Sequence, residues 1–410
     1  MRKVGLKWIV EKVAIRMVLI LYLLLFHGCV EPFEAQTLTF ESALVVDASI
    51  TNEIKQQEIQ LSRTFAFEAD GPQPERNASV NVLDDQGSSL LFVEESPGIY
   101  HSETAFGALS GRTYQLLITT SNGRTYKSEP SRLTPAATMD KLFAERTTNS
   151  DEVEGMAIRV NSSSSSGKAR NYRYEYEETY KIVAPQWTPK QLVPDPGTLC
   201  DMLVVPREKD EQTCYATDAS NSIILTDTNS LPTDQVQDFT VRFINRKNYI
   251  ITYRYSILVR QYVQSSTAYT FFETLKDFSG TGSLFSQIQP GFLEGNVYSV
   301  ENPEEKVLGY FDVASVTEKR IFFDYTDFFP GEPLPPYVIP CSVSAPPLTA
   351  GLPPHCVLRS IVAANTVRYL NDNGQPGLGE GPYLVVPRAC GDCTALGKTA
   401  VPAFWTDNNK

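Results

Sequence analysis

The segment "ALVVDASI" at positions 43–50 carries the pattern that decides the fold. Every second residue of this segment is apolar: Leu44, Val46, Ala48 and Ile50. This period of two is typical of a β-strand that buries one face. The segment "QEIQLSRTFAF" (57–67) repeats the pattern with apolar residues at odd positions. The sequence therefore predicts a run of short β-strands at the start of the folded chain.

Turn signals continue this pattern over residues 38–135. The segment 78–94 reads as strand, turn, strand, and the segment 111–129 as a second hairpin turned by "NG" at 122–123. Tyr114 follows a turn and is expected to tie a loop to the edge of the sheet. Short strands and turns at this spacing predict an immunoglobulin/fibronectin-like β-sandwich.

A linker at 131–140 leads into a larger β-rich domain, residues 140–410. The segment "YIITYRYSILVRQYV" (249–263) predicts a strong strand. One clear helix should follow, capped by Ser265 or Ser266, because apolar residues then recur every three to four positions. The overall fold class is mainly β, and the 20 Tyr, 21 Phe and 27 Pro residues agree with strands and turns.

Two segments of this second domain lack regular periodicity. Residues 184–240 are rich in Pro, Asp, Thr and Ser and are interpreted as a long, partly ordered excursion. Residues 330–354 contain nine prolines and are interpreted as a Pro-rich surface loop rather than a sheet.

The amino terminus has the pattern of an export signal. Residues 1–16 are basic, and "MVLILYLLLF" (17–26) is too short for a bilayer span of about 20 residues. Gly28 and Cys29 then fit the end of a lipoprotein signal, although Phe26 and His27 depart from the usual pattern. We therefore expect a signal peptide at 1–28, acylation of Cys29 that anchors the protein in a lipid bilayer, and a tether at 29–37. The alternative is an uncleaved signal anchor in the inner membrane.

The charge balance argues against nucleic acid as a partner. The whole chain has a formal charge of −12, and the first 28 residues carry five basic and one acidic side chain, so the remainder has −16. Such an acidic protein repels a phosphate backbone.

Six cysteines remain when Cys29 is set aside. An even number in an exported chain predicts structural disulfides. The easiest local pair is Cys200–Cys214, and the last four could pair locally as Cys341–Cys356 and Cys390–Cys393, or across. The motif "ACGDC" (389–393) also allows a redox site or a zinc site that includes His355, but no amphipathic helix follows it. We expect no metal and no cofactor.

No catalytic motif stands out. The only histidines outside the signal are His101 and His355, and neither accompanies a Gly-x-Ser-x-Gly motif. A hydrolase would require a carboxylate- or aromatic-lined cleft near one of them. Binding is the simpler expectation. Candidate ligand-binding residues are aromatic, and the alternative for them is packing in the core: Tyr172, Tyr174, Tyr176 and Trp187.

Several segments together resemble a known family. These are "ALVVDASITNE" (43–53), "IQLSRT" (59–64), "YSILVRQYVQSSTAYTFFETLKD" (255–277), "SGTGSLFSQIQPGFLEGNV" (279–297), "EEKVLGYFDVASV" (304–316) and "CGDCTALGKTAVPAFW" (390–405). In this order they resemble the Bacteroidota lipoproteins grouped as domain of unknown function 4249. Ala48 stands where that family usually has glycine, with Asp47 before it.

The resemblance implies an outer-membrane lipoprotein that is often encoded beside a TonB-dependent receptor of the starch-utilisation type. It implies no catalytic residues. We therefore expect a non-catalytic accessory in nutrient uptake or envelope assembly. The alternatives are a surface glycan- or peptide-binding lipoprotein and a hydrolase. Glu31 and Glu34, just after Cys29, favour the cell surface over the periplasmic face.

Overall fold

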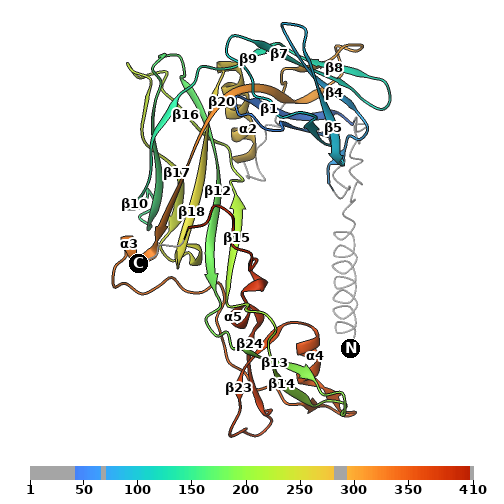
Figure 1. Ribbon diagram of the computed structural model, residues 1–410, viewed down its shortest axis with the longest axis vertical. Coiled ribbons are helices and arrows are strands. Elements are labelled where there is room, and N and C mark those ends of the chain that lie inside the picture. The colour runs from blue at the N-terminus through green and yellow to red at the C-terminus, as the bar shows by residue number, and fades with distance from the viewer. Residues whose placement is uncertain (1–41, 66–70, 281–292, 407–410) are drawn as a thin grey trace, which may run out of the picture. The chain divides into compact units, whose positions relative to one another are not determined.

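The computed structural model describes residues 42–65, 71–280 and 293–406. Figure 1 shows their elements in chain order. The predicted signal peptide, the predicted acylation site Cys29 and the whole tether lie outside the described residues.

The first region contains nine strands: β1 (Leu44–Thr51), β2 (Glu58–Arg63), β3 (Gln73–Pro74), β4 (Ser79–Asp84), β5 (Ser89–Ser96), β6 (Ile99–Ser102), β7 (Thr113–Thr119), β8 (Thr125–Ser128) and β9 (Ser131–Arg132). Both predicted hairpins are present, as β4–β5 and β7–β8. The hydroxyl of Tyr114 accepts a hydrogen bond from the backbone N–H of Leu109 at 2.8 Å, which confirms that this tyrosine ties a loop to the sheet.

The second region begins with strands β10 (Thr138–Thr148), β11 (Glu154–Ser163), β12 (Asn171–Val183), β13 (Lys190–Pro194), β14 (Met202–Pro206), β15 (Thr213–Ala219), β16 (Ile224–Asp227), β17 (Gln235–Asn245) and β18 (Arg254–Gln264). It ends with β19 (Val297–Ser299), β20 (Val307–Asp324), β21 (Thr349–Ala350), β22 (His355–Cys356), β23 (Val367–Asp372) and β24 (Tyr383–Pro387). The interpretation of 184–240 as a partly ordered excursion is wrong, since the four strands β13–β16 and the first part of β17 fall within it. Strands β13 and β14 pair with each other as a hairpin, whereas β15 and β16 pair with β12, and β17 pairs with β11, so local periodicity does not reveal the last three pairings.

The helical elements are α2 (Ser266–Gly280), α3 (Tyr325–Phe328), α4 (Val357–Ala363), α5 (Arg388–Gly391) and the 3-10 turns η1 (Tyr249–Ile251) and η2 (Cys393–Ala395). The predicted helix is α2, and the hydroxyl of Ser265 caps it by accepting a hydrogen bond from the N–H of Ala268 at 3.1 Å. The fold class is mainly β with one clear helix, as predicted.

The long strand β20 joins the two regions into one sheet. Its first half pairs in parallel with β1, and its second half pairs antiparallel with β18. The described part of the resulting sheet has 15 strands and runs from β15 through β12, β18, β20, β1 and β2 to β8 and β19. Figure 1 shows β20 as one continuous strand. The boundary predicted near 135–140 falls between β9 and β10, and the division into two domains stays a prediction.

Two hydrophobic cores lie on this sheet. The first collects the inward residues of β1, including Leu44, Val46, Ala48 and Ile50, together with residues from β2 to β8, β19 and the start of β20. The second lies between the sheet formed by β12 and β18 and a separate three-stranded sheet, β10–β11–β17. The alternation predicted for "ALVVDASI" is confirmed, because these four residues are all buried.

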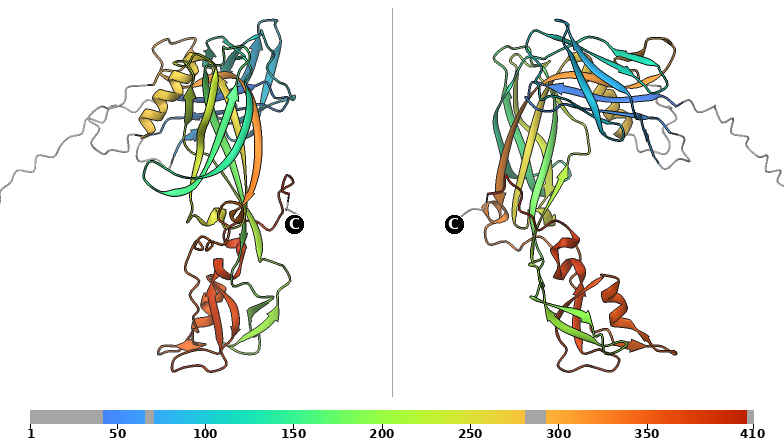
Figure 2. Two further views of the ribbon diagram at one scale, coloured as in Figure 1. Left: turned by 90° about the vertical axis from the view of Figure 1, so that its left-hand side faces the viewer. Right: turned by 45° about the vertical axis from the view of Figure 1, so that its right-hand side comes forward.

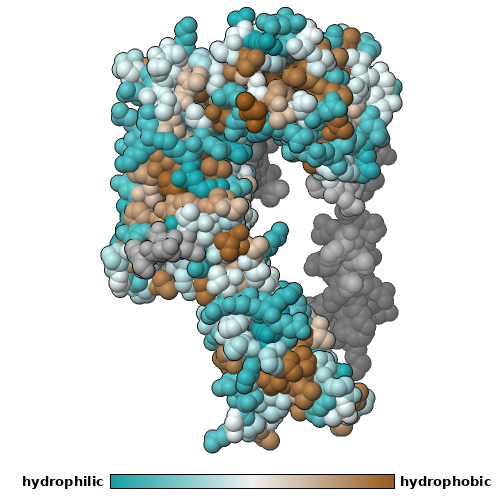
Figure 3. All heavy atoms as spheres, in the orientation of Figure 1, coloured by the Kyte–Doolittle hydropathy of each residue, from teal (hydrophilic) through white to brown (hydrophobic). Residues whose placement is uncertain are grey.

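A small module forms from segments that are far apart in sequence. The hairpin β13–β14, the hairpin β23–β24 and helix α4 share a core of five buried residues: Leu192, Met202, Leu358, Tyr369 and Val385. In Figure 3 brown, apolar residues gather over this module near the bottom of the view. Leu199 and Leu352 are among its exposed side chains.

All six described cysteines form disulfides, but none of the local pairings is correct. The bonds are Cys200–Cys356, Cys214–Cys393 and Cys341–Cys390. Strand β14 carries the chain away from Cys200 before Cys214 enters the main sheet on β15, so these neighbours in sequence are not neighbours in space. The three bonds instead connect the carboxyl-terminal segment to the excursion, to the sheet and to the Pro-rich loop.

Candidate functional site

The face of the main sheet opposite the cores is polar. On β1, Asp47 and Ser49 alternate with the buried core residues, and the parallel register places Ser49 opposite Asp312 on β20. On the next strands, Arg173 of β12 lies opposite Tyr262 of β18. Strand alternation therefore gathers charged and hydroxyl-bearing side chains from four strands on one face.

Helix α2 packs across this polar face against β12, β18 and β20. Figure 2 shows the helix alongside the strands. The ring of Phe271 lies 5.1 Å from that of Tyr310, and the hydroxyls of Thr267 and Tyr310 are 2.8 Å apart. The helix thus covers part of the polar face of the main sheet.

Three cavities flank α2. The first, about 470 Å³, is lined by Phe272, Leu275, Tyr176 and the turn Ser220–Ser222. The second, about 770 Å³, is lined by Thr270, Thr274, Tyr310 and Asp312. The third, about 350 Å³, is lined by Asp47, Ser49, Glu58, His101, Arg173, Glu175, Tyr262, Phe272, Tyr310 and Asp312, among others. Shared residues connect them, so we call the three cavities together the α2 cleft.

Arg173 stands at the centre of the cleft. Its guanidinium lies over the rings of Tyr262 at 4.5 Å and Phe272 at 4.7 Å. It forms an ion pair with Glu175, which also accepts a hydrogen bond from the Tyr262 hydroxyl at 2.9 Å. The stacked rings and the ion pair hold the guanidinium in place between the first and third cavities.

Two carboxylates of the cleft have raised pKa values, although Asp312 is buried and Asp47 is exposed. Burial raises the pKa of Asp312, and the nearby charge of Arg173 only partly opposes that rise. Burial also raises the pKa of Asp47, whose side chain is nevertheless open to the cavity. Asp312 accepts a hydrogen bond from the amide of Gln264 at 2.9 Å. Perturbed carboxylates in a cavity are a feature of functional sites.

His101 lines the third cavity, so a carboxylate-lined cleft does lie near one of the two candidate histidines. Both of its ring nitrogens lie 3.1 Å from carboxylate oxygens, one of Glu58 and the other of Glu95. A catalytic base needs a ring nitrogen that faces a hydroxyl or a water, and this arrangement places acids there instead. His355 is exposed on β22.

The prediction that Tyr172 and Tyr174 bind a ligand is wrong, because both are buried in the core between the two sheets. The hydroxyl of Tyr172 donates to Asp234 at 2.7 Å, and the ring of Tyr174 stacks on Phe239 at 5.3 Å. Their strand face is opposite to that of Arg173, since neighbouring residues of a strand point to opposite sides.

The two other aromatic candidates have different surroundings. Tyr176 is half-buried, lines the first cavity and packs against the second core, and the Arg242 guanidinium of β17 lies 5.5 Å from its ring. Trp187 is half-buried against the second core, away from the cleft residues. Of the four candidates, only Tyr174 and Tyr176 border the cleft, and Tyr176 is the less buried of the two.

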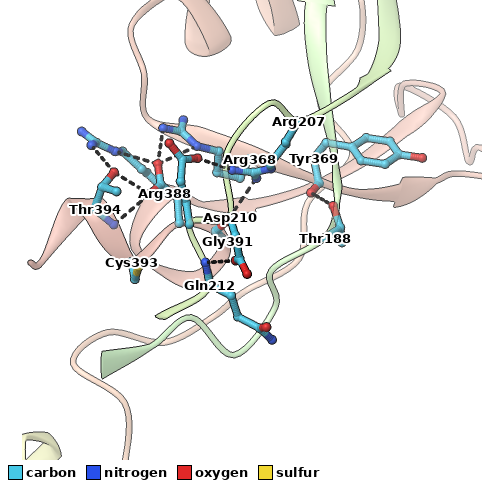
Figure 4. Close-up of polar contacts among 12 residues, drawn as sticks. Thr188, Arg207, Asp210, Gln212, Arg368, Tyr369, Arg388, Gly391, Cys393 and Thr394 are labelled. Atoms are coloured by element: carbon cyan, nitrogen blue, oxygen red, sulfur yellow. Dashed lines mark hydrogen bonds and ion pairs between the residues drawn. The ribbon is translucent and has the colours of Figure 1, made fainter. Parts of the chain in front are cut away.

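The "ACGDC" motif is structural. Cys390 and Cys393 bond to Cys341 and Cys214, so the motif does not form its own disulfide. The buried carboxylate of Asp392 accepts hydrogen bonds from Arg368 at 3.0 Å and from the Thr394 N–H at 2.8 Å, and it also pairs with Arg388. Figure 4 shows the side chains of Arg368, Arg388 and Thr394 close to one another beside Gly391 and Cys393. Burial raises the pKa of Asp392, but the bonds from Thr394 and Arg368 outweigh it and hold the pKa below its usual value.

The key residues of the cleft were missed from sequence: Asp47, Arg173, Glu175 and Asp312. The sequence signal that could have identified them is the presence of charged residues at alternate positions of strands whose other positions are apolar or aromatic. Within the described residues, no group of three or more His, Cys, Asp or Glu side chains is arranged to hold a metal ion. In that same part of the chain, no helix is long and apolar enough to cross a membrane.

The fold and the site together describe a mainly β protein that is cross-linked by disulfides and has a polar cleft beside helix α2. The chain belongs to the family described as "Domain of unknown function (DUF4249)", whose model matches residues 30–320. A comparison with curated proteins found no match.

Among solved structures, the chain has a weak similarity to a DUF4785 family protein from Legionella pneumophila subsp. pneumophila strain Philadelphia 1. The sequence identity is 9% and the TM-score is 0.16. The match covers 53% of this chain and 51% of that one, so it spans about half of each. A TM-score this low supports no conclusion about fold or function.

Proposed function

We propose that this protein is a non-catalytic, lipid-anchored binding protein of the bacterial outer membrane that assists a TonB-dependent receptor. Its recognition site is the α2 cleft. The observation that carries the proposal is the use of the cysteines. All six described cysteines are in disulfides, and the seventh, Cys29, follows the short apolar segment after His27 and Gly28. Disulfides persist in oxidising compartments, which supports export.

Acylation of Cys29 would supply the anchor. Each buried methylene contributes about 0.8 kcal/mol, so two or three acyl chains hold a protein firmly at a bilayer. The acidic residues Glu31 and Glu34 support a position on the cell surface. A surface position would place the α2 cleft where it can deliver a ligand to a receptor in the same membrane.

The cleft supports a binding role by its size and lining. Cavities of about 350 to 770 Å³ lie within the usual range for ligand sites. The walls of the first and second cavities combine aromatic rings with a few charged groups, as is usual for such sites, while the third cavity is mainly polar. The role in nutrient uptake or envelope assembly rests on the family resemblance.

Metabolic labelling tests the anchor. Cells that express the wild-type protein should incorporate labelled palmitate into it, and the variant Cys29→Ala should not. Mass spectrometry of the mature protein should find an acylated Cys29 as the first residue. An unprocessed amino terminus would show that the chain is a signal anchor. Protease treatment of intact cells then distinguishes the surface from the periplasmic face.

Co-purification tests the accessory role. After solubilisation in mild detergent, the tagged protein should bring down a TonB-dependent receptor. If the tagged protein is repeatedly recovered without any receptor, the accessory role is wrong. A matched Cys29→Ala variant, recovered from the soluble fraction, shows whether the membrane anchor is needed for the association.

A glycan- or peptide-binding lipoprotein without a receptor is the second candidate, and the half-buried Tyr176 beside the first cavity favours it. Titration with glycan and peptide panels would distinguish it from the receptor accessory. The hydrolase alternative predicts turnover that is lost in His101→Ala. If His101→Ala hydrolyses a panel of esters and glycosides as the wild type does, the hydrolase alternative is excluded.

A further inference from the structure

We propose that the third cavity of the α2 cleft binds a primary ammonium group, held by the carboxylates of Asp47 and Asp312 and the hydroxyl of Ser49. This inference rests on the proposed binding role of the α2 cleft and names the chemistry of its ligand. A primary ammonium occurs on lysine side chains of peptides and on free polyamines.

The charges of the cavity favour a cation. Apart from His101, its lining includes four carboxylate side chains and two cationic side chains: Asp47, Glu58, Glu175, Asp312, Lys55 and Arg173. An excess of one sign in a concave site concentrates ligands of the opposite charge. The cavity should therefore exclude anions and attract cations.

Both bases already have carboxylate partners. The ammonium of Lys55 lies 2.8 Å from a carboxylate oxygen of Glu53, and Arg173 pairs with Glu175. Among the described residues, neither Asp47 nor Asp312 forms an ion pair with a side chain. These two carboxylates supply the unmatched negative charge.

Unpaired acceptors lie beside the two carboxylates. The hydroxyl oxygen of Ser49 is buried, lines the cavity and has no hydrogen-bond partner within the described part of the chain. Ser49 lies opposite Asp312 in the register of β1 and β20. Gln264 donates its amide to Asp312, while its own side-chain oxygen is buried and, among the described residues, lacks a donor. Buried polar groups without partners are uncommon and call for an explanation.

An ammonium group satisfies this arrangement. It carries three N–H donors and no acceptor. The cavity offers two carboxylates and one free hydroxyl on the same face of neighbouring strands. Metal binding fits less well, because the described residues include no group of three or more metal-binding side chains.

Calorimetric titration of the mature, detergent-solubilised protein tests the inference. The probes are the capped peptide Ala-Ala-Lys-Ala-Ala, the same peptide with norleucine in place of lysine, and 1,5-diaminopentane. We expect the lysine peptide or the diamine to bind and the norleucine peptide not to bind. If only the peptide binds, the source is a protein or peptide; if the diamine binds equally well, it is a free amine.

Variants locate the site. Asp47→Asn should weaken binding at least about tenfold, because one charge-assisted hydrogen bond contributes roughly 1.5 to 3 kcal/mol. Ser49→Ala, which keeps every charge, should weaken it less. The matched control is Asp151→Asn, on an exposed turn far from the cleft residues in sequence, and it should bind as wild type.

Three results would overturn the inference: equal binding of the norleucine peptide, no binding of either amine, or unchanged affinity in Asp47→Asn. Circular dichroism confirms that each variant is folded. The receptor experiment is independent of this one. If Asp47→Asn still recovers the receptor and the wild type binds no amine, the ligand class is wrong and the accessory role stands.

Discussion

The carboxylate of Glu178 on β12 accepts a 2.6 Å hydrogen bond from the hydroxyl of Tyr255 on β18. Glu178 is 4% exposed and also pairs with Arg242 of β17, at 3.0 Å, across the second core. Burial and the charge of Glu178 raise the pKa of Tyr255 well above its usual value. One buried acid thus links the main sheet to the three-stranded sheet.

Glu178→Gln should therefore destabilise the protein by about 2 to 3 kcal/mol, because it leaves the Arg242 charge without its partner in a mostly buried site. Denaturant unfolding measures the change. Glu318→Gln is the matched control: its pair with Arg260 is exposed on both sides, and its removal should cost less than about 1 kcal/mol. Equal losses in the two variants would show that Glu178 does not link the two sheets.

The Cys214–Cys393 bond should be a major source of stability. It closes a loop with a sequence separation of 179 residues. Replacing both cysteines by serine should cost about 3 to 5 kcal/mol through the entropy of the unfolded chain. Non-reducing peptide mapping checks the pairing directly. Recovery of a Cys200–Cys214 peptide would contradict the three long-range bonds.

The Asp392 cluster should make the protein sensitive to acid. The pKa of Asp392 is held below its usual value of 3.8, so its ionised form is favoured in the folded state. The stability that this contributes is present above pH 3.8 and is lost as the pH falls through the lower, folded-state pKa. Unfolding curves of Asp392→Asn should depend less on pH in that acid range than those of wild type. Asp151→Asn should retain the wild-type dependence.

Asp312 should affect the pH dependence of stability in the direction opposite to Asp392. Burial raises its pKa, so the folded state favours the protonated form, and stability falls as the pH rises from 3.8 through the raised value. At neutral pH, Asp312→Asn should therefore stabilise the protein by about 1 kcal/mol, while it weakens amine binding. Thermal unfolding at pH 7 measures the first effect. A clear loss of stability would mean that Asp312 serves the fold and not a ligand.

Sequence periodicity predicted the strands better than their partners. The alternation of residues 43–50 and the two hairpins correspond to β1, β4–β5 and β7–β8. The parallel pairing of β1 with β20 has no local signal, because more than 250 residues separate the strands. The same limitation affected the disulfides, whose even number was predictable while their pairing was not.

The residues of the candidate site were also hard to predict from sequence. Tyr172 and Tyr174 were predicted to bind a ligand, with core packing as the alternative; both lie in the core, and Arg173 between them lies in the cleft. A strand pattern identifies two faces without indicating which one is buried. In this protein a second sheet covers one face of β12. The aromatic residues on that face are therefore buried in the core, and the charged residues between them lie on the other face, in the cleft.

By itself, the sequence determined the mainly β class, the helix at 266–280, the disulfide chemistry and the expectation of an anchor at Cys29, because each depends on local pattern or composition. Only the tertiary structure decided the rest. It brought Asp47, Ser49, Arg173 and Asp312 to one cavity, because the cleft forms where strands far apart in the chain pair edge to edge beneath α2. Pairing between distant strands is a property of the whole fold, and no short segment encodes it.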